Sequence, residues 1–255
     1  MKIQYCSDLH LEFSTNSKWL EINPIKPVGE ILIVAGDTYY LGKEFSSHPW
    51  FDYASKNWEQ VILIPGNHEF YGGFDAKISY QLDYEFNIRD NVTLVNNKSL
   101  SIGGTRFIFT TLWSKIEHQI GPILGSLNDF RLIQINNKRL SIESYNSLFD
   151  LSWKFLKAEI DREIDKQTVV VTHHMPSDLC NLPMYKGSKL NEAFCTDLTN
   201  EIESSNIYAW IFGHSHGNIE NFEIGNTMML TNQLGYIEHG AEQYYKGNMY
   251  FEVNS

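Results

Sequence analysis

Short apolar runs alternate along this chain with longer polar segments, and the runs are rich in isoleucine, valine and aromatic residues. Runs of about four to eight such residues, bounded by turn-forming residues, are typical of buried strands. The two glycines at 103–104 indicate a hairpin between the strands beside them. The predicted strands cover residues 3–7, 31–35, 61–65, 92–95, 100–102, 106–110, 169–172, 209–212, 219–224, 227–231 and 249–253.

Apolar residues at steps of three or four predict helices between several of these strands. Phe51, Ala54 and Trp58 place one helix between the second and third strands, and this strand–helix–strand order implies parallel pairing. A longer helix is predicted to begin near Ser141, and another to follow a cap at Asp75. The buried faces of the other helices are marked by Ile78, Leu82 and Phe86, by Tyr145, Leu148, Phe155, Ile160 and Ile164, and by Phe194, Leu198 and Ile202.

Three segments show neither the apolar runs of strands nor the helical spacing of apolar residues. Residues 14–27 and 177–189 are polar and contain proline, so we expect surface loops there, and residues 112–140 follow no clear pattern. Strands and helices alternate in the first half, whereas the end of the chain is rich in strands alone. This order predicts an α/β fold with two mixed β-sheets packed face to face, helices outside them, and residues 227–231 in the second sheet. We expect one domain over residues 1–255.

The composition narrows the class of protein. With 255 residues, 42% of them apolar, the chain can bury a substantial core. A net charge of -11 argues against general nucleic-acid binding, because such surfaces are usually basic. No apolar run approaches the roughly 20 residues that span a bilayer, and the chain opens on a strand, so a cytoplasmic location without membrane association is expected. Cys6, Cys180 and Cys195 lack the spacing of a disulfide framework or a zinc site.

Metal-binding residue types follow five of the predicted strands. Ligands in open α/β sheets collect beyond the carboxyl ends of the strands, so these five segments are expected to converge. Six of the nine histidines lie in them, whereas His48, His118 and His239 receive no role. Either member of the His173-His174 pair could face the site, and His173 is favoured because it directly follows the strand. The segments are Asp8-Leu9-His10, Gly36-Asp37, Gly66-Asn67-His68-Glu69, His173-His174 and Gly213-His214-Ser215-His216.

In this order the five motifs resemble those of the calcineurin-like metallophosphoesterase superfamily, from residue 3 to about residue 216. That family has two mixed sheets sandwiched between helices, a four-layer αββα arrangement that agrees with the fold expected above. Three flanking strings are similar to a bacterial and phage branch of the superfamily: Gly66-Asn67-His68-Glu69-Phe70-Tyr71-Gly72, Thr111-Leu112-Trp113 and Asn128-Asp129-Phe130-Arg131.

The resemblance implies two divalent metal ions. Asp8, His10 and His216 would hold one ion, and Asn67, His173 and His214 the other, with Asp37 bridging them. Two such ions can turn a bridging water into hydroxide and stabilise the phosphorus as the leaving oxygen departs. Mixed nitrogen and oxygen ligands suit Mn, Fe, Zn, Co or Ni.

The resemblance also gives His68 a role beside the metals, as a general acid or charge stabiliser on the leaving-group side. A histidine titrates near working pH, which suits proton transfer. For Glu69 two roles stay open: it orients His68, or it is a surface carboxylate that caps the following turn.

The segment after Asp37 narrows the substrate. Protein phosphatases of the superfamily carry an arginine there that grips a phosphomonoester, and this chain has none. We therefore expect a phosphoesterase that handles small phosphodiesters at least as well as monoesters. Arg131 is the candidate for a missing clamp, or it forms a structural ion pair. The alternatives are a phosphomonoesterase of the same fold and a non-catalytic metal-binding scaffold.

Overall fold

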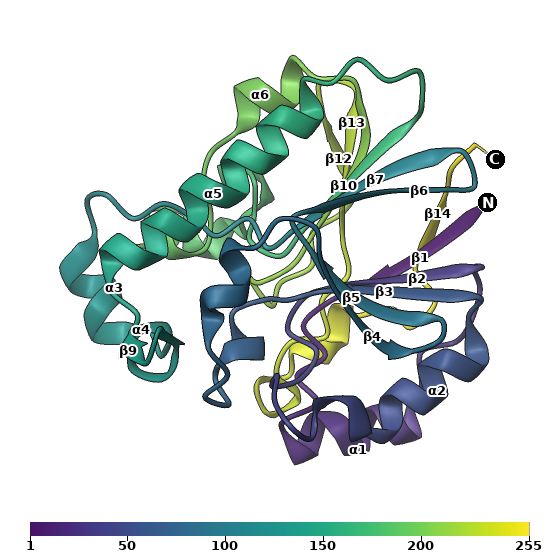
Figure 1. The fold of residues 1–255 in the computed structure, drawn as a ribbon, viewed down its shortest axis with the longest axis horizontal. Helices are drawn as coiled ribbons and strands as arrows, with labels where there is room; N and C mark the ends of the chain where they lie inside the picture. Colours follow the sequence, from purple (N-terminus) through teal and green to yellow (C-terminus); the bar gives the residue numbers. More distant parts are fainter. Residues whose placement is uncertain (255) are drawn as a thin grey trace.

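The computed structural model describes residues 1–254 and contains two six-stranded sheets that pack face to face between helices (Figure 1). The first sheet has the order β14-β1-β2-β3-β5-β4, and the second has the order β12-β13-β11-β10-β7-β6. The strands of the first sheet are β1 (Lys2–Cys6), β2 (Ile31–Ala35), β3 (Gln60–Ile64), β4 (Tyr84–Arg89), β5 (Val92–Asn96) and β14 (Tyr250–Glu252). Those of the second are β6 (Lys98–Ile102), β7 (Thr105–Thr110), β10 (Thr168–Thr172), β11 (Ile207–Phe212), β12 (Phe222–Ile224) and β13 (Thr227–Thr231).

The two sheets have the same plan. In each, four central strands run parallel, and an antiparallel strand closes either edge. Parallel strands need crossover connections, which place helices on the outer faces. The expected α/β class with two packed mixed sheets is therefore confirmed, and residues 227–231 do lie in the second sheet.

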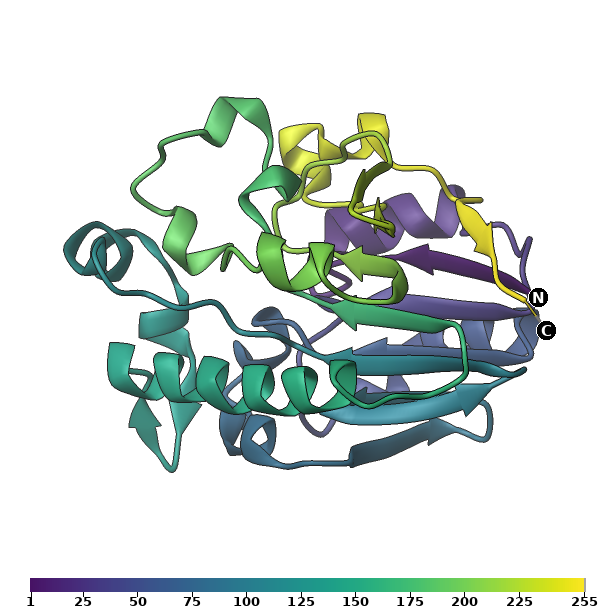
Figure 2. The same ribbon diagram turned by 90° about the horizontal axis from the view of Figure 1, so that it is seen from above.

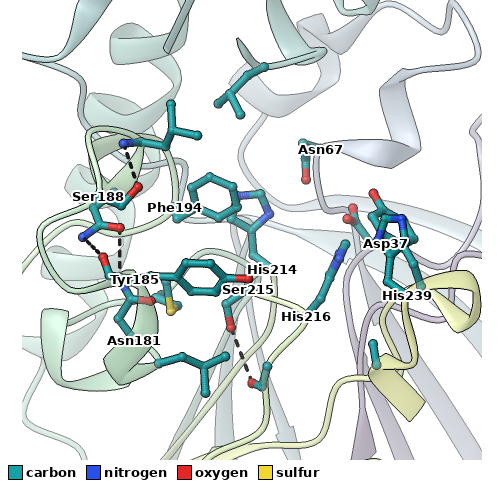
Figure 3. Close-up of a pocket in the computed structure, with 18 of the residues that line it drawn as sticks. Asp37, Asn67, Asn181, Tyr185, Ser188, Phe194, His214, Ser215, His216 and His239 are labelled. Atoms are coloured by element: carbon teal, nitrogen blue, oxygen red, sulfur yellow. Dashed lines mark hydrogen bonds between the residues drawn. The ribbon is translucent and has the colours of Figure 1, made fainter. Parts of the chain in front are cut away.

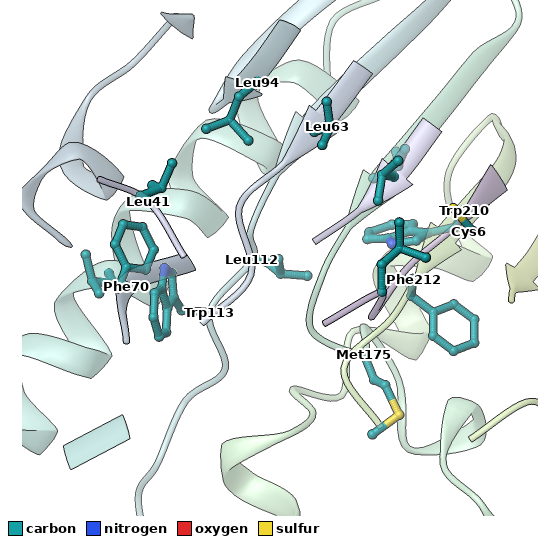
Figure 4. Close-up of a cluster of buried hydrophobic side chains, with 14 of the residues drawn as sticks. Cys6, Leu41, Leu63, Phe70, Leu94, Leu112, Trp113, Met175, Trp210 and Phe212 are labelled. Carbon is teal, nitrogen blue, oxygen red and sulfur yellow. The ribbon is translucent and has the colours of Figure 1, made fainter. Parts of the chain in front are cut away.

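Side chains alternate between the two faces of each strand, so the sequence builds two kinds of core. Ile33, Ile62, Phe109, Val171 and Ile211 point between the sheets and form a buried apolar layer. Their neighbours along the strands point outward against the helices, and Figure 4 shows Leu63, Leu94, Trp210 and Phe212 among these. Both faces of the central strands are buried, which explains why their sequences are continuous apolar runs.

Helices cover the outer faces, with α1 (Ser14–Ile22) and α2 (Pro49–Asn57) on the first sheet and α5 (Ile142–Ile160) and α6 (Thr199–Glu203) on the second (Figures 1 and 2). The long helix begins where predicted, because the hydroxyl of Ser141 accepts a hydrogen bond from the backbone of Ser144. Ile164 lies beyond its end. Residues 112–140 contain α3 (Ile120–Ser126), α4 (Asp129–Leu132) and a small hairpin of β8 (Gln134–Ile135) and β9 (Lys138–Arg139).

The prediction of a loop over residues 14–27 was wrong, because α1 occupies its first part. Only Asn16 and Leu20 of this helix are buried, so the sequence carries almost no apolar stripe. Both prolines of the segment lie after the helix ends. This helix is therefore stabilised by the packing of a few buried side chains against the rest of the protein, and the local sequence pattern does not predict it.

Two predicted helices are interrupted. Asp75 does cap a helical segment, but it is a short 3₁₀ turn over Ala76–Tyr80, and Phe86 lies in the edge strand β4. The helix predicted from Phe194 to Ile202 is split, because Cys195 forms a backbone bridge with Met175, and only α6 remains helical. In the segment 177–189, 3₁₀ turns interrupt the expected loop. None of the helices in residues 1–254 is both long and apolar enough to cross a bilayer.

Candidate metal centre

Five strand ends meet at one edge of the sandwich. β1, β2 and β3 come from the first sheet and β10 and β11 from the second, and each is followed by one of the motifs that the sequence singles out. A backbone bridge between Ser7 and Gln233 joins the two sheets beside the site. The expectation that these segments converge matches the geometry: two groups of donor atoms lie here and share Asp37.

The first group consists of Asp8, His10, Asp37 and His216, whose ligand atoms all lie within 4.8 Å of one another. The Nε2 atoms of His10 and His216 are 2.9 Å apart. His216 Nε2 lies 3.4 Å from Asp8 Oδ1, and His10 Nε2 lies 3.7 Å from Asp37 Oδ2.

The second group consists of Asp37, His173 and His214, and the side chain of Asn67 reaches it. His173 Nε2 lies 3.1 Å from His214 Nδ1, 3.2 Å from Asn67 Oδ1 and 3.4 Å from Asp37 Oδ1. The structure brings His173 into this group and leaves its neighbour His174 outside. Figure 3 shows Asp37, Asn67, His214 and His216 around the same opening.

The second nitrogen of these rings is tied to the protein. His173 Nδ1 donates to the carbonyl of Ala35 at 2.9 Å, and His214 Nε2 faces the carbonyl of Ala193 at 3.3 Å. In the neutral rings with these tautomers, the lone pairs of His173 Nε2 and His214 Nδ1 point at each other, and a cation between them would relieve this contact. A proton can serve: burial lowers the pKa of His173, but Asp37, Asp8 and the carbonyl of Ala35 together outweigh it and raise the pKa to about 10. A metal ion fits the same position and replaces that proton.

Asp37 has the environment of a bridging ligand. It is fully buried, and its Oδ2 accepts no hydrogen bond from any described residue. Although burial raises the pKa of this carboxyl, His173 and His68 outweigh it and hold the pKa well below its usual range. A buried carboxylate oxygen without a donor is costly unless a cation faces it. The residues present therefore fit divalent ions in both groups.

Five of the candidate ligand residues adopt a strained backbone conformation, which directs their side chains into the site. Asp8, His10, Asp37, His214 and His216 all have positive φ, between 48° and 75°. Residues other than glycine rarely adopt this conformation, and such strain clusters at functional sites.

Glycines next to the ligands leave the room they need. A Cβ on Gly66 would lie 2.1 Å from Asp37 Oδ1 and 2.6 Å from His173 Nε2, and one on Gly36 would lie 2.3 Å from His173 Nδ1. The glycines of the sequence motifs are thus required by the packing of the donor atoms themselves.

His68 lies beside the first group and is held at both nitrogens. Its Nδ1 lies 2.9 Å from Glu12 Oε1, and the hydroxyl of Tyr236 lies 3.1 Å from its Nε2. Burial lowers the pKa of His68, but Asp37 and Glu12 outweigh this and raise it to about 9. In the metal-free protein His68 is therefore an imidazolium near neutral pH, and bound cations would lower its pKa.

Glu12 was not singled out by the sequence. Its Oε1 accepts from His10 Nδ1 at 3.0 Å as well as from His68, so one buried carboxylate orients both rings. The signal was its position two residues after the Asp-x-His motif. Histidines that bind metals commonly donate their other nitrogen to a carboxylate in this way.

Neither expected role of Glu69 is what the geometry shows. The side chain is fully buried and accepts hydrogen bonds from the backbone of Asp37, Thr38 and Gly66, at 3.0, 2.7 and 2.6 Å. Burial and Asp37 raise its pKa to about 8 against these donors. Glu69 thus ties together the two loops that carry Asp37 and Asn67, and Glu12 orients His68 instead.

Asn67 is oriented by a second buried carboxylate. Its Nδ2 donates to Asp129 Oδ1 at 2.9 Å, so its Oδ1 must face His173 and the second group. The hydroxyl of Tyr71 also donates to Asp129 Oδ1 and stands 3.1 Å from Asn67 Nδ2. Burial raises the pKa of Asp129. This contact gives the Asn-Asp-Phe-Arg string of the sequence a structural reason.

Arg131 of the same string forms neither a clamp nor an ion pair. Its Nη2 donates to the carbonyl of Gly125, and the residue is exposed and does not line the site. His174 is buried beside Trp113 and Tyr145, and burial with His173 lowers its pKa to about 3, so it is a neutral core residue. His48 caps α2.

The donor groups open into a cavity of about 730 Å³. Among residues 1–254, no lysine or arginine lines it. Its acidic residues are Asp37 and Asp129, both already described, and His239 also lines it (Figure 3). The cavity wall therefore offers no lysine or arginine to a phosphate, and bound ions would supply most of the charge that attracts it.

Comparison with known proteins agrees with this geometry. The model of the family "calcineurin-like phosphoesterase" matches residues 1–218. An uncharacterised protein of Acanthamoeba polyphaga mimivirus is 31% identical over 271 residues, which cover 92% of this chain and 91% of that protein. The crystal structure of phosphopantetheinyl hydrolase from Mycobacterium tuberculosis superposes with a TM-score of 0.70 at 17% identity, over 95% of this chain and 92% of that one. This likeness shows a shared fold.

Loss of the Asp129 carboxylate should weaken metal binding by the second donor group without unfolding the chain. In Asp129→Asn the new amide can present a donor to Asn67 Nδ2, so Asn67 no longer has a reason to keep its Oδ1 inward. We expect metal affinity at one site to fall about 10–100-fold, as for other contacts that orient ligands. Titration with Mn²⁺ followed by calorimetry measures it.

Asp150→Asn, at an exposed position of α5, is the matched control and should bind Mn²⁺ as the parent does. Equal affinity of the two variants for both ions would show that Asp129 does not position Asn67.

Proposed function

Because this chain belongs to the calcineurin-like phosphoesterase family, we propose that it hydrolyses phosphate esters with two divalent metal ions and favours phosphodiesters over monoesters. The observation that supports this most is the pair of donor groups that share the buried, unpartnered carboxylate of Asp37. A non-catalytic scaffold is not favoured, since every ligand position is filled and the donors face each other at bonding range.

Asp8, His10 and His216 would hold one ion, Asn67, His173 and His214 the other, and Asp37 would contact both. When bound, two divalent ions activate a water molecule as the nucleophile and neutralise charge on the phosphate. The nitrogen and oxygen donors suit Mn, Fe, Zn, Co or Ni.

His68 is the proposed general acid. Glu12 holds its Nδ1, so the proton at Nε2 is the one that can leave, and Nε2 is the atom directed at Tyr236 on the cavity wall. An imidazolium there would donate its proton to the departing alkoxide, which is a poor leaving group without it.

The preference for diesters rests on the uncharged wall. A monoester dianion has three free oxygens, and enzymes specialised for it generally add arginines whose planar donors match the phosphate. No lysine or arginine among residues 1–254 lines this cavity, and Arg131 is engaged elsewhere. A diester has a single charge and two free oxygens, which the ions and His68 can satisfy.

Protein purified without chelator and loaded with Mn²⁺ should contain two ions per chain by elemental analysis. Asp37→Ala should lose the most, because one carboxylate serves both groups, and its remaining occupancy should fall below one. A parent protein that saturates at one ion would contradict the two-ion site.

His68→Ala should keep its metal while kcat falls about 10²–10⁴-fold, the usual worth of a positioned acid. Glu12→Gln tests the same role through pH. The acid works while protonated, so activity falls as pH rises through its pKa. Glu12 raises that pKa, hence the substitution should move the alkaline limb of kcat/KM to lower pH, at saturating metal. Metal loss in His68→Ala, or an unmoved limb in Glu12→Gln, would speak against the assignment.

Nitrophenyl phosphate and nitrophenyl phenylphosphonate, compared under one metal condition, test the substrate class. Nitrophenyl phenylphosphonate has a single charge and stands in for a diester. We expect its kcat/KM to equal or exceed that of nitrophenyl phosphate, and we expect Arg131→Ala to change neither value. A large monoester preference that collapses in Arg131→Ala would make Arg131 the missing clamp and overturn this proposal.

A further inference from the structure

One side of the cavity is formed by the chain segment that leads from β10 toward α6. Leu182, Met184, Tyr185, Leu190 and Phe194 of this segment line it, and we call these five residues the 181–194 wall. Met184 and Tyr185 are 76% and 42% exposed. Large apolar side chains left open inside a concave site commonly mark where an apolar part of a ligand binds.

The polar side chains of the same segment are already used. Asn181 Nδ2 donates to Asn191 Oδ1 at 3.2 Å, and Asn191 Nδ2 donates to the carbonyl of Tyr185 at 3.0 Å. The hydroxyl of Ser188 accepts from the backbone of Leu190 at 3.2 Å. Asn181, Ser188 and Asn191 also line the cavity, and Figure 3 shows Asn181 and Ser188 beside Tyr185. The amide groups of Asn181 and Asn191 and the hydroxyl of Ser188 therefore already have partners within the segment.

The segment also offers no charge to the cavity. Lys186 and Lys189 belong to it but do not line the site. Glu192 turns away, since its Oε2 accepts from the backbone of residues 117, 118 and 119. Neither an anionic nor a cationic substituent would find a partner on this side.

The wall is continuous with the second donor group. The ring of Phe194 lies 4.6 Å from that of His214, centre to centre. His68, in contrast, packs 4.4 Å from His10 in the first group. A phosphate between the two groups that directs its leaving oxygen at His68 would turn its other ester group toward Phe194 and the wall.

From these placements we infer that the substrate is a phosphodiester whose retained ester group is uncharged and apolar, and that the 181–194 wall binds this group. The inference rests on the proposed function, and it adds the chemical class of one of the two ester groups. A nucleotide chain or a sugar phosphate on this side would leave its charges and hydroxyls against an apolar surface.

Four para-nitrophenyl phosphodiesters test this with one leaving group and four retained groups: ethyl, hexyl, carboxypentyl and aminohexyl. We expect kcat/KM of the Mn²⁺-loaded protein to be about tenfold higher for hexyl than for ethyl, because each fully buried methylene is worth roughly fourfold and this wall is partly open. The carboxypentyl and aminohexyl esters should be no better than the ethyl ester.

A matched pair of variants locates the effect. Met184→Asn should lower the hexyl-to-ethyl ratio about threefold. Leu179→Asn should leave the ratio unchanged, since Leu179 is 58% exposed on the same segment but does not line the cavity. Equal ratios in the two variants would place the apolar site elsewhere and overturn the inference.

Binding provides a readout without turnover. Calorimetry with hexyl and ethyl methylphosphonate, whose alcohols are poor leaving groups, should give a Kd about tenfold lower for the hexyl ester. Tighter hexyl binding without hydrolysis of any ester would support the wall and refute the proposed function. Hydrolysis of all esters at one rate, with equal Kd values, would refute the wall and leave the proposed function standing.

Discussion

Nitrogen and oxygen donors that face each other across Asp37 impose the main constraint on this molecule. Ring nitrogens of His173 and His214 lie 3.1 Å apart, and those of His10 and His216 lie 2.9 Å apart, within a site that excludes water from Asp8 and Asp37. A cation, whether a proton or a metal ion, stabilises such a cluster of buried donors and carboxylates. The carboxyl ends of strands from both sheets must therefore meet at one edge of the sandwich, because each of the two groups that share Asp37 draws its donors from both sheets.

The local backbone follows from that constraint. Donors on five loops can point inward only if the loops turn sharply, and this accounts for the positive φ of Asp8, Asp37 and His214. Glu69 anchors the loops of Asp37 and Asn67 through three backbone donors. The strained residues also hold each other, since the backbone of His214 donates to the carboxylate of Asp8 and that of His10 to the carbonyl of Asp37.

The sequence pattern predicted the central strands, which are buried on both faces, and the site at their carboxyl ends. The apolar runs that end at Ala35 and Phe212 fit few structures other than a buried strand. The rule that ligands collect at the carboxyl ends of strands then located the donors. Helix α1 could not be predicted, because Leu20 is its single buried apolar residue. The helix expected through Phe194 failed for a tertiary reason, since the bridge of Cys195 to Met175 breaks it.

The residues that orient the donors were harder to see than the donors. Glu12 has only its position two residues after the Asp-x-His motif as a signal, and Asp129 has none, because a carboxylate can reach a histidine or an asparagine from many places in a chain. Asp129 lies 62 positions from its partner Asn67. Only the folded chain shows that both are buried, and burial separates an orienting carboxylate from an ordinary surface one.

The absence of lysine and arginine from the cavity wall in residues 1–254 agrees with the charge of the donor groups. Asp8 and Asp37 carry two negative charges, while two divalent ions would bring four positive ones, so the centre itself is an excess cation. A wall of further arginines would add to this excess and favour a dianion, whereas a wall without them agrees with the diester preference proposed above. If the ions alone recognise the charge of the phosphate, discrimination among diesters has to come from shape and apolar contact. The partly open side chains beside His214 are where this chain can supply that contact.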